Sequence, residues 1–450
     1  MNKLIRNRDF LSNRGGKLFI ENVSAEFLAR KFGTPIYVYS ESRIRENSQR
    51  VKSALAAATE NSQLFYAVKA NNNLSILSIL RSENLGADAA GPFEIELAQR
   101  AGFSKNKILY SGVFHSDEEL KFGLKSGVAI NLDSLSAAKR LLKFGKPSLF
   151  SMRVNPGISG GKIRGLIFAG SDAKFGESMT NTIAAYRLAK KRGVKKFGLH
   201  AMTGSCVLDE NYFAAITEKL LMIANTIQKK TGVKFKFIDI GGGLGIPYRT
   251  NEKILNVEKA MKLAAKVFAA GVAKFNLGNP KLMLEPGRFL VGDAGIILMK
   301  IQTIKAAAKT FIGVDAGMQT LLRPALYDAW HEILPANNLN AQNSKKISVV
   351  GPICENTDQF ARNRLLPKLA EKDLLAILDT GAYGFGMASN YNTRAKPAEV
   401  LVSGEKAEMI REREGLNEII GKQKVPKRLK KGRKSFLNFP ANPSVKAVSI

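Results

Sequence analysis

Eight short apolar runs, separated by amphipathic stretches, most constrain what this chain can fold into. They span residues 64–68, 85–90, 107–112, 127–133, 149–156, 197–202, 235–240 and 282–286. Strand-like runs that alternate with helical patterns are typical of repeated βα units with parallel strands. Eight such units in about 230 residues match a (β/α)8 barrel in length. In a barrel of this kind, functional side chains gather at the carboxyl ends of the strands.

The last of the long helical patterns illustrates this reading. Between Val257 and Phe268 the apolar residues recur at spacings of three and four, which predicts one buried helical face. Gly271 follows the pattern, and the sequence predicts that it ends the helix.

The pattern of apolar residues changes after residue 290, where short β-like runs replace the long helical patterns. A chain of 450 residues exceeds what one core usually supports, so we expect two structural domains. The predicted division is an N-terminal segment that joins a β domain, a barrel, a mostly β C-terminal domain and a basic flexible tail. These parts span residues 1–40, 41–289, 290–421 and 422–450, respectively.

The charge balance is strongly basic, with 69 Lys and Arg against 38 Asp and Glu and a net charge of +31. Residues 421–450 hold nine basic residues and no acidic one, but most of the excess lies elsewhere. A basic tail can bind nucleic acid, although a solvated basic surface explains it equally simply and no nucleic-acid-binding motif is present. The chain also lacks an apolar run long enough to span a membrane and a secretory signal, so we expect a cytoplasmic protein.

Cysteine and histidine are scarce. Cys206 and Cys354 are the only cysteines, and His115, His200 and His331 are the only histidines. These are too few for a disulfide framework or a thiolate metal centre, so we expect no metal.

Lys69 directly follows the first predicted strand, in the sequence YAVKANNN. A lysine at a strand end can simply reach solvent. Alternatively, a partly desolvated lysine with a lowered pKa is suited to forming a Schiff base with a carbonyl cofactor.

Residues after two further strands suit an anionic ligand. The sequence GGGLG at residues 241–245 lets backbone N–H groups approach a phosphate, although tight βα turns also use glycine. In EPGR at residues 285–288, Arg288 can bind a phosphate, and Glu285 can hold a proton on a pyridine nitrogen.

Together these segments resemble one family. YAVKANNN, GGGLG, EPGR, GPICENTD and GAYGFGMASNYNTRAKPAEVLV are similar to motifs of the fold-type III decarboxylases that depend on pyridoxal 5′-phosphate. RPALYDAWHEI and CENTDQFARNRLLP most resemble the diaminopimelate decarboxylases among them. The resemblance runs from about residue 20 to 420, with the motifs in family order. It implies a (β/α)8 barrel with a second, mostly β domain, as in alanine racemase and ornithine decarboxylase.

The resemblance also implies roles for individual residues. Lys69 forms the Schiff base, near Asp88 and Glu94. Cys354 donates a proton from the partner subunit of a homodimer, whereas Cys206 is a small buried hydrophobe. Further cofactor contacts come from Asp88, Met202, Ser205, Gly242, Gly243, Glu285, Pro286, Gly287, Arg288 and Tyr383. The implied substrate contacts come from Arg288, Arg323, Tyr327, Glu355 and Tyr383.

One position departs from the family pattern. The family usually has His-x-His-Ile-Gly-Ser where this chain reads HAMTGS, and the second histidine stacks on the cofactor ring. Here Met202 replaces that histidine, while His200 and Ser205 match the pattern. A thioether can cover an aromatic face but carries no charge, so Met202 is either a ring contact or core filling.

The leading hypothesis is an enzyme that converts meso-2,6-diaminopimelate to L-lysine and CO2, the last step of lysine biosynthesis. A related decarboxylase of ornithine, arginine or a carrier-linked amino acid is the enzymatic alternative. A weakly active or non-catalytic homologue is the third reading, because of Met202.

Overall fold

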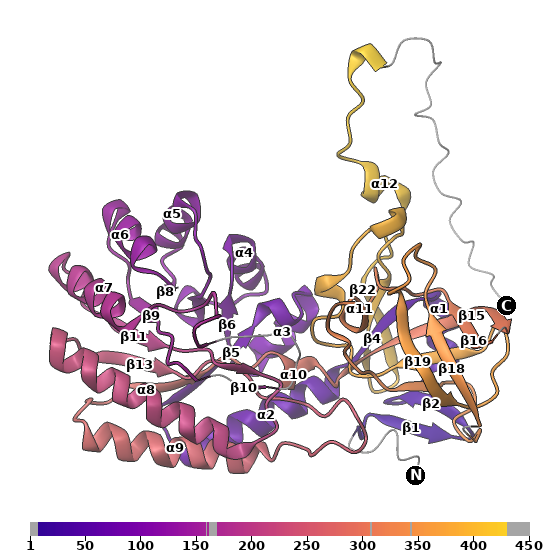
Figure 1. Cartoon of the computed structure of the whole chain (residues 1–450), viewed down its shortest axis with the longest axis horizontal. Helices are drawn as coiled ribbons and strands as arrows, with labels where there is room; N and C mark the ends of the chain where they lie inside the picture. Colours follow the sequence, from indigo (N-terminus) through magenta and orange to yellow (C-terminus); the bar gives the residue numbers. More distant parts are fainter. Residues whose placement is uncertain (1–7, 159, 162–168, 307, 343, 430–450) are drawn as a thin grey trace.

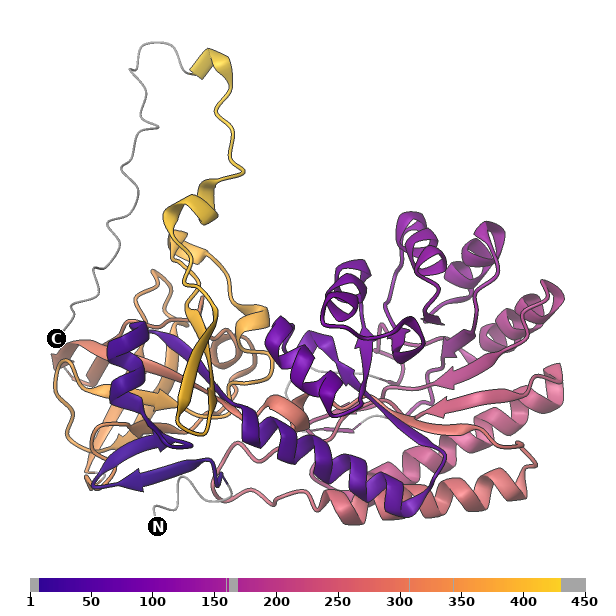
Figure 2. The same ribbon diagram turned by 180° about the vertical axis from the view of Figure 1, so that it is seen from behind.

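The computed structural model describes residues 8–158, 160–161, 169–306, 308–342 and 344–429. Figures 1 and 2 show two lobes side by side, a barrel wrapped in helices and a β domain, with a C-terminal arm that projects from the β domain. The predicted basic tail is described only as far as residue 429, and the rest of it lies outside the described residues.

The barrel is closed by eight parallel strands in the order β11-β13-β14-β5-β6-β7-β8-β9. Each predicted run overlaps one of these strands, so the predicted (β/α)8 fold is confirmed. The strands are β5 (Ser62–Ala67), β6 (Gly86–Ala89), β7 (Ile108–Tyr110), β8 (Ala129–Leu132), β9 (Phe150–Arg153), β11 (Phe197–His200), β13 (Phe235–Asp239) and β14 (Lys281–Leu284).

Helices follow the strands and pack outside them (Figure 1). Most begin at a Ser, Asn or Asp whose side chain accepts an N–H of the first turn, as at Ser116 before α5. The helices of the barrel are α2 (Glu41–Ala58), α3 (Leu74–Ser82), α4 (Pro92–Arg100), α5 (Asp117–Ser126), α6 (Leu135–Phe144), α7 (Met179–Lys191), α8 (Glu210–Thr231), α9 (Val257–Lys274) and α10 (Arg288–Val291), with 3-10 turns η2 (Val68–Ala70) and η3 (Lys105–Lys107).

The prediction that Gly271 ends the last long helix is wrong, because α9 continues to Lys274. A Cβ atom at Gly271 would lie 2.6 Å from Leu221 Cδ1 of α8. The glycine therefore permits the close packing of α8 against α9, and this contact offsets its weak helix propensity.

Large side chains fill the interior of the barrel. Phe65, Leu109, Phe237 and Met283 form a small buried cluster apart from the main core. Gly198 makes room for it, since a Cβ there would lie 2.2 Å from the Phe237 ring. The interior is thus packed rather than hollow, which leaves the strand ends as the place for a site.

The β domain is built from both ends of the chain. Strand β4 (Ile36–Ser40) lies between β15 and β21 in a nine-stranded sheet, and β1 to β3 form a separate antiparallel sheet. The remaining strands are β1 (Leu11–Arg14), β2 (Lys17–Ile20), β3 (Val23–Ser24), β15 (Gly295–Ala306), β16 (Thr310–Val314), β17 (Ile333–Pro335), β18 (Lys345–Val350), β19 (Gln359–Leu366), β20 (Leu374–Ile377), β21 (Ala398–Ser403) and β22 (Lys406–Arg411).

Short helices complete this domain, and a two-stranded parallel pair lies beside the barrel mouth. The helices are α1 (Ala25–Phe32), α11 (Arg323–Tyr327), α12 (Leu416–Ile420), η4 (Phe385–Met387), η5 (Tyr391–Thr393) and η6 (Lys427–Leu429). The parallel pair consists of β10 (Gly160–Gly161) and β12 (Gly204–Ser205).

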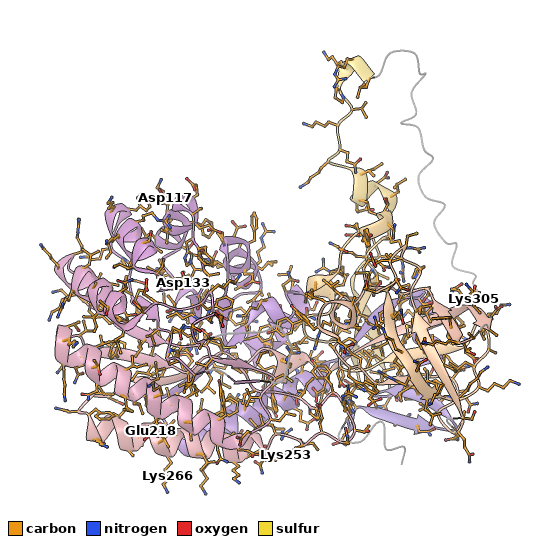
Figure 3. All side chains as sticks on the ribbon, viewed as in Figure 1. Asp117, Asp133, Glu218, Lys253, Lys266 and Lys305 are labelled. Atoms are coloured by element: carbon orange, nitrogen blue, oxygen red, sulfur yellow. The ribbon has the colours of Figure 1, made fainter. Side chains whose placement is uncertain are left out.

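Charged side chains cover the outer surface. Figure 3 shows Glu218 of α8 and Lys266 of α9 on the helical layer that faces away from the barrel. Across the residues that the structure describes, we find no helix with the length and apolarity required to cross a membrane.

Candidate active site

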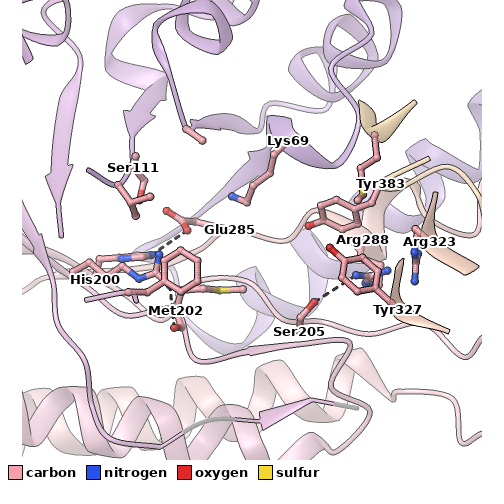
Figure 4. A pocket seen from close by; sticks show the side chains of 16 residues that line it. Lys69, Ser111, His200, Met202, Ser205, Glu285, Arg288, Arg323, Tyr327 and Tyr383 are labelled. Atoms are coloured by element: carbon pink, nitrogen blue, oxygen red, sulfur yellow. Dashed lines mark hydrogen bonds and ion pairs between the residues drawn. The ribbon is translucent and has the colours of Figure 1, made fainter. Parts of the chain in front are cut away.

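A cavity of about 320 Å³ lies at the carboxyl ends of the barrel strands, where the barrel meets the β domain (Figure 4). Its walls come from both lobes. The lining residues are Lys69, Ala90, Ser111, Gly112, Val113, Arg153, Phe175, His200, Met202, Ser205, Glu285, Arg288, Arg323, Tyr327, Tyr383 and Met387.

Lys69 and Asp88 form a close ion pair at one end of the cavity. Lys69 lies in η2, directly after β5, and its Nζ donates to Asp88 Oδ2 at 2.6 Å. Asp88 is the last residue but one of β6 and is fully buried. Burial and the nearby Glu285 raise the pKa of Asp88 to about 7, although Lys69 opposes this shift.

The sequence-based expectation of a lowered pKa for Lys69 is wrong for this structure. Burial lowers the pKa of the amine, but the charges of Asp88, Tyr383 and Glu285 outweigh burial and raise it. Asp88 on the adjacent strand β6, whose closeness sequence spacing does not reveal, is the largest of the charges that decide the direction of the shift.

Glu285, His200 and Asp239 form a second buried group beside the first. His200 Nε2 lies 3.1 Å from Glu285 Oε2. One ring nitrogen of His200 and one carboxylate oxygen each of Asp239 and Glu285 lie within 4.8 Å of one another. Burial raises the pKa of Glu285, but His200, Lys69 and Arg153 outweigh burial and lower it. Burial and the Glu285 charge raise the pKa of Asp239 well above its usual value. Of the two carboxyl groups, Glu285 therefore carries the negative charge, and Asp239 holds a proton more readily.

The glycine-rich segment after β13 packs tightly against the strand that carries Glu285. A Cβ atom at Gly242 would lie 2.4 Å from the Glu285 backbone oxygen, and Gly243 has a φ of +98°. Glycine is the residue that fits at both positions, because it avoids the clash at Gly242 and the backbone strain at Gly243. Pro286 and Gly287 continue the chain from Glu285, and Gly287 precedes α10, which begins at Arg288. Arg288 Nη2 donates to Ser205 Oγ at 3.4 Å.

Met202 lies between these groups and lines the cavity. Its Sδ accepts the Gly242 N–H at 3.2 Å, and its backbone oxygen accepts from Arg153 Nη2 at 3.3 Å. The side chain is thus at the cavity wall rather than within the barrel core.

The other end of the cavity is rich in arginine and tyrosine. Figure 4 places Arg288, Arg323, Tyr327 and Tyr383 together, away from Lys69, Glu285 and His200. The Arg288 guanidinium lies 4.8 Å from the centroid of the Tyr383 ring. We call this region the arginine end, and the region of Lys69, Asp88, Asp239 and Glu285 the carboxylate end.

Seven predicted residues are not among those that line this cavity within the single chain. Five of them adjoin lining residues, namely Asp88, Gly242, Gly243, Pro286 and Gly287, whereas Cys354 and Glu355 lie apart from it. Cys354 and Glu355 are exposed in the loop before β19 and are not among the lining residues. The Cys354 N–H donates to Asn392 Oδ1 at 3.1 Å. Cys206 is buried, and its Sγ donates to the Ile246 backbone oxygen at 3.5 Å. Glu94 accepts the Ala90 N–H at 2.7 Å, beside the cavity wall.

Several site residues have no role in the sequence-based prediction, among them Arg153, Asp239 and Tyr248. Arg153 is the last residue of β9, so the rule that strand ends carry chemistry would have found it. Tyr248 lies seven per cent exposed beyond the glycine-rich segment and hydrogen-bonds to both Arg288 and Arg323. Nothing in the local sequence indicates that contact.

The residues present fit pyridoxal 5′-phosphate. Buried polar atoms at the cavity have no partner within the described residues, among them Asp88 Oδ1, Glu285 Oε1 and Arg288 Nε. A primary amine, a carboxylate and an arginine beside glycine amides match an aldehyde, a pyridine nitrogen and a phosphate.

Known proteins match the chain over most of its length. Residues 41–292 match the family of the pyridoxal-dependent decarboxylases, pyridoxal binding domain. A diaminopimelate decarboxylase of Methanothermobacter thermautotrophicus is 44% identical over 424 residues, covering 94% of this chain and 99% of the relative.

Solved structures agree with these matches. The diaminopimelate decarboxylase of Methanocaldococcus jannaschii, in complex with L-lysine, aligns with a TM-score of 0.85 at 34% identity, covering 95% of this chain and all of that chain. The diaminopimelate decarboxylase of Helicobacter pylori, also in complex with L-lysine, aligns with a TM-score of 0.81 at 31% identity. The alignment covers 88% of this chain and 98% of that chain. The chain therefore belongs to the pyridoxal-dependent decarboxylases and, within them, to the diaminopimelate decarboxylase family.

Proposed function

We propose that this chain decarboxylates meso-2,6-diaminopimelate to L-lysine and CO2, the last step of lysine biosynthesis, with pyridoxal 5′-phosphate as cofactor. The arginine end carries the proposal. Arg288 and Arg323 are buried there, and no ion pair joins either to a carboxylate in the part of the chain that the structure describes. A substrate with a second amino-acid head brings the carboxylate that such a pair can bind, whereas a simple diamine precursor does not.

The carboxylate end serves the reaction centre. When bound, the cofactor supplies a conjugated ring that accepts the electron pair left on the substrate carbon as CO2 departs. Lys69 is the amine that binds the cofactor covalently, and Asp88 fixes the position of that amine through their 2.6 Å contact. Glu285 is the carboxylate that would hold a proton on the ring nitrogen of the bound cofactor, because its pKa is lowered by His200 and Lys69 despite burial.

The phosphate is assigned to the opposite wall of the cavity. Ser205, Arg288 and the amides of Gly242 and Gly243 form the cradle, and Tyr383 lies beside it. The Tyr383 N–H donates to the Ala70 backbone oxygen at 2.7 Å, which ties the β domain to the segment after Lys69. Met202 lines the cavity and would contact the ring of the bound cofactor through its thioether. The cradle would hold the phosphate, and Lys69 would hold the aldehyde carbon.

Replacement of the departing CO2 by a proton requires an acid on the substrate side. We assign this role to Cys354. We assign recognition of the distal ammonium to Glu355, while Arg323 and Tyr327 contact the distal carboxylate. Because Cys354 and Glu355 lie outside the cavity of their own chain, a second copy supplies them in a homodimer. The proton goes to the carbon that lost CO2, and the product is L-lysine.

The substrate assignment is tested by measuring CO2 release from diaminopimelate, ornithine, arginine and lysine with the purified enzyme and pyridoxal phosphate. We expect release from diaminopimelate and little from the others. Release from ornithine alone would make this a diamine-forming decarboxylase, and no release from any of them would favour a non-catalytic homologue. We also propose a cytoplasmic location, with which the free thiols of both cysteines are compatible.

The dimer is tested by mixing two inactive variants. Cys354→Ala alone should lower kcat by about 10²- to 10⁴-fold, the range for a lost general acid. In an equimolar mixture with Lys69→Ala, random exchange of subunits makes half of the dimers mixed. One of the two sites in each mixed dimer then contains both Lys69 and Cys354, so about a quarter of wild-type activity should return. Full activity of Cys354→Ala, or no recovery after exchange, would remove the shared-site assignment.

A further inference from the structure

Two buried arginines from different lobes converge on one phenol at the arginine end. Arg288 belongs to α10 of the barrel, and Arg323 belongs to α11 of the β domain. Arg323 Nη1 donates to Tyr248 Oη at 2.5 Å, and Arg288 Nη1 donates to the same oxygen. All three side chains are buried, with exposures of seven per cent or less.

The phenol lowers the cost of holding two like charges close together. Buried guanidinium groups need hydrogen-bond acceptors, and no ion pair with a carboxylate is found for either within the described residues. The Tyr248 ring adds an attractive face, because the two guanidinium carbons lie 4.6 Å and 5.6 Å from its centroid. Tyr248 thus contacts both cations through its oxygen and its ring.

Tyr248 is itself held from both lobes. Its backbone N–H donates to Glu252 Oε2 at 2.8 Å on the barrel side. Its ring meets the edge of His331, with centroids 5.2 Å apart, and His331 Nδ1 donates to the Leu378 backbone oxygen at 2.8 Å. Burial and the Arg323 charge keep the pKa of His331 well below its usual value, so a neutral ring supports the phenol.

We propose that Tyr248 is a positioning residue that couples the phosphate cradle to recognition of the distal carboxylate of the substrate. It fixes the separation of Arg288, which lies beside Ser205, and Arg323, which faces the substrate. Tyr248 contacts neither reacting atom, and it acts through the two arginines. This inference rests on the proposed function for the identity of the substrate, but the contact with Arg288 does not depend on it.

The test compares Tyr248→Phe with Tyr186→Phe in the holoenzyme. Tyr186 is a matched control, because its buried phenol donates to the Gly198 backbone oxygen and does not line the cavity. We measure KM and kcat for diaminopimelate, cofactor retained after equilibrium dialysis by its visible absorbance, and the thermal midpoint.

For Tyr248→Phe we expect KM to rise about tenfold and the dissociation constant of pyridoxal phosphate to rise about threefold or more, with kcat within about threefold of wild type. Tyr186→Phe should lower the thermal midpoint and leave KM and cofactor retention unchanged. An unchanged KM or unchanged retention in Tyr248→Phe, or equal effects in both variants, would overturn the coupling.

Failure of the proposed function gives a different result. If wild-type enzyme releases no CO2 from diaminopimelate, the substrate assignment fails. Cofactor retention in the two variants still decides whether Tyr248 positions Arg288, and KM is then measured with the substrate that the panel identifies.

Discussion

The two ends of the cavity differ in the sign of their buried charges: one end buries carboxylates, and the other buries guanidinium groups. At the carboxylate end, Asp88, Asp239 and Glu285 are buried within reach of Lys69 and His200, and their pKa values are shifted in different directions. At the arginine end, Arg288 and Arg323 share a phenol and have no carboxylate partner among the described ion pairs. Charges balanced within the protein suit proton and electron-pair chemistry, whereas unbalanced cations suit anionic groups of a ligand.

The carboxylate end should fail completely when its amine is removed. We expect Lys69→Ala to lose the visible absorbance of the bound cofactor and to reduce decarboxylation to background, because Lys69 is the one lysine among the described residues that line the cavity. The control is Lys253→Ala, which removes a lysine paired with Glu210 on the surface. A wild type that stays colourless with added pyridoxal phosphate would contradict the cofactor assignment.

The arginine end should lose affinity rather than chemistry. Arg323→Lys keeps the charge but loses the planar pair of donors, so we expect KM for diaminopimelate to rise about tenfold with kcat nearly unchanged. Steady-state kinetics test this, with Arg249→Lys as a control beyond the main cavity. A fall in kcat with constant KM would show that the arginine end contributes to the chemical step rather than to substrate affinity.

Only the carboxylate end should titrate near neutral pH. Because the folded-state pKa of Asp88 is raised from 3.8 to about 7, the folded protein binds a proton more tightly than the unfolded chain. Its contribution is complete below pH 3.8 and is lost as pH rises towards 7. The cofactor-free protein should therefore lose at most about 4 kcal/mol of unfolding free energy over that interval.

Chemical denaturation at several pH values measures this loss. Asp88→Asn should flatten the pH dependence, and Arg323→Lys should leave it as in wild type. An equally steep dependence in Asp88→Asn would assign the titration to another group.

The smallest effect is expected at Met202, between the two ends. Met202→His restores the residue usual in the family, and we expect the decarboxylation rate to change about twofold to fivefold without loss of cofactor binding. Single-turnover kinetics and cofactor absorbance test this, with Met202→Leu as a size-matched control. Identical kinetics in all three proteins would show that the side chain is not a ring contact.

The sequence predicted much of the fold because each βα unit carries a local signal. The eight apolar runs each overlap a barrel strand, and Lys69, Glu285 and Arg288 line one cavity as their positions after strands imply. The end of α9 was mispredicted because the packing of Gly271 on Leu221 is a contact between helices. Cys354 and Glu355 stay a prediction, since their place in a site depends on a second chain.

The sequence by itself determined the strand order along the chain and the types of residue at the strand ends. Periodicity and residue type are local properties, and they survive in any window of the sequence. Only the tertiary structure decided that the pKa of Lys69 rises beside Asp88, and that Tyr248 joins Arg288 to Arg323 across the two lobes. Electrostatic shifts and shared hydrogen bonds depend on distances through space, which no spacing along the chain supplies.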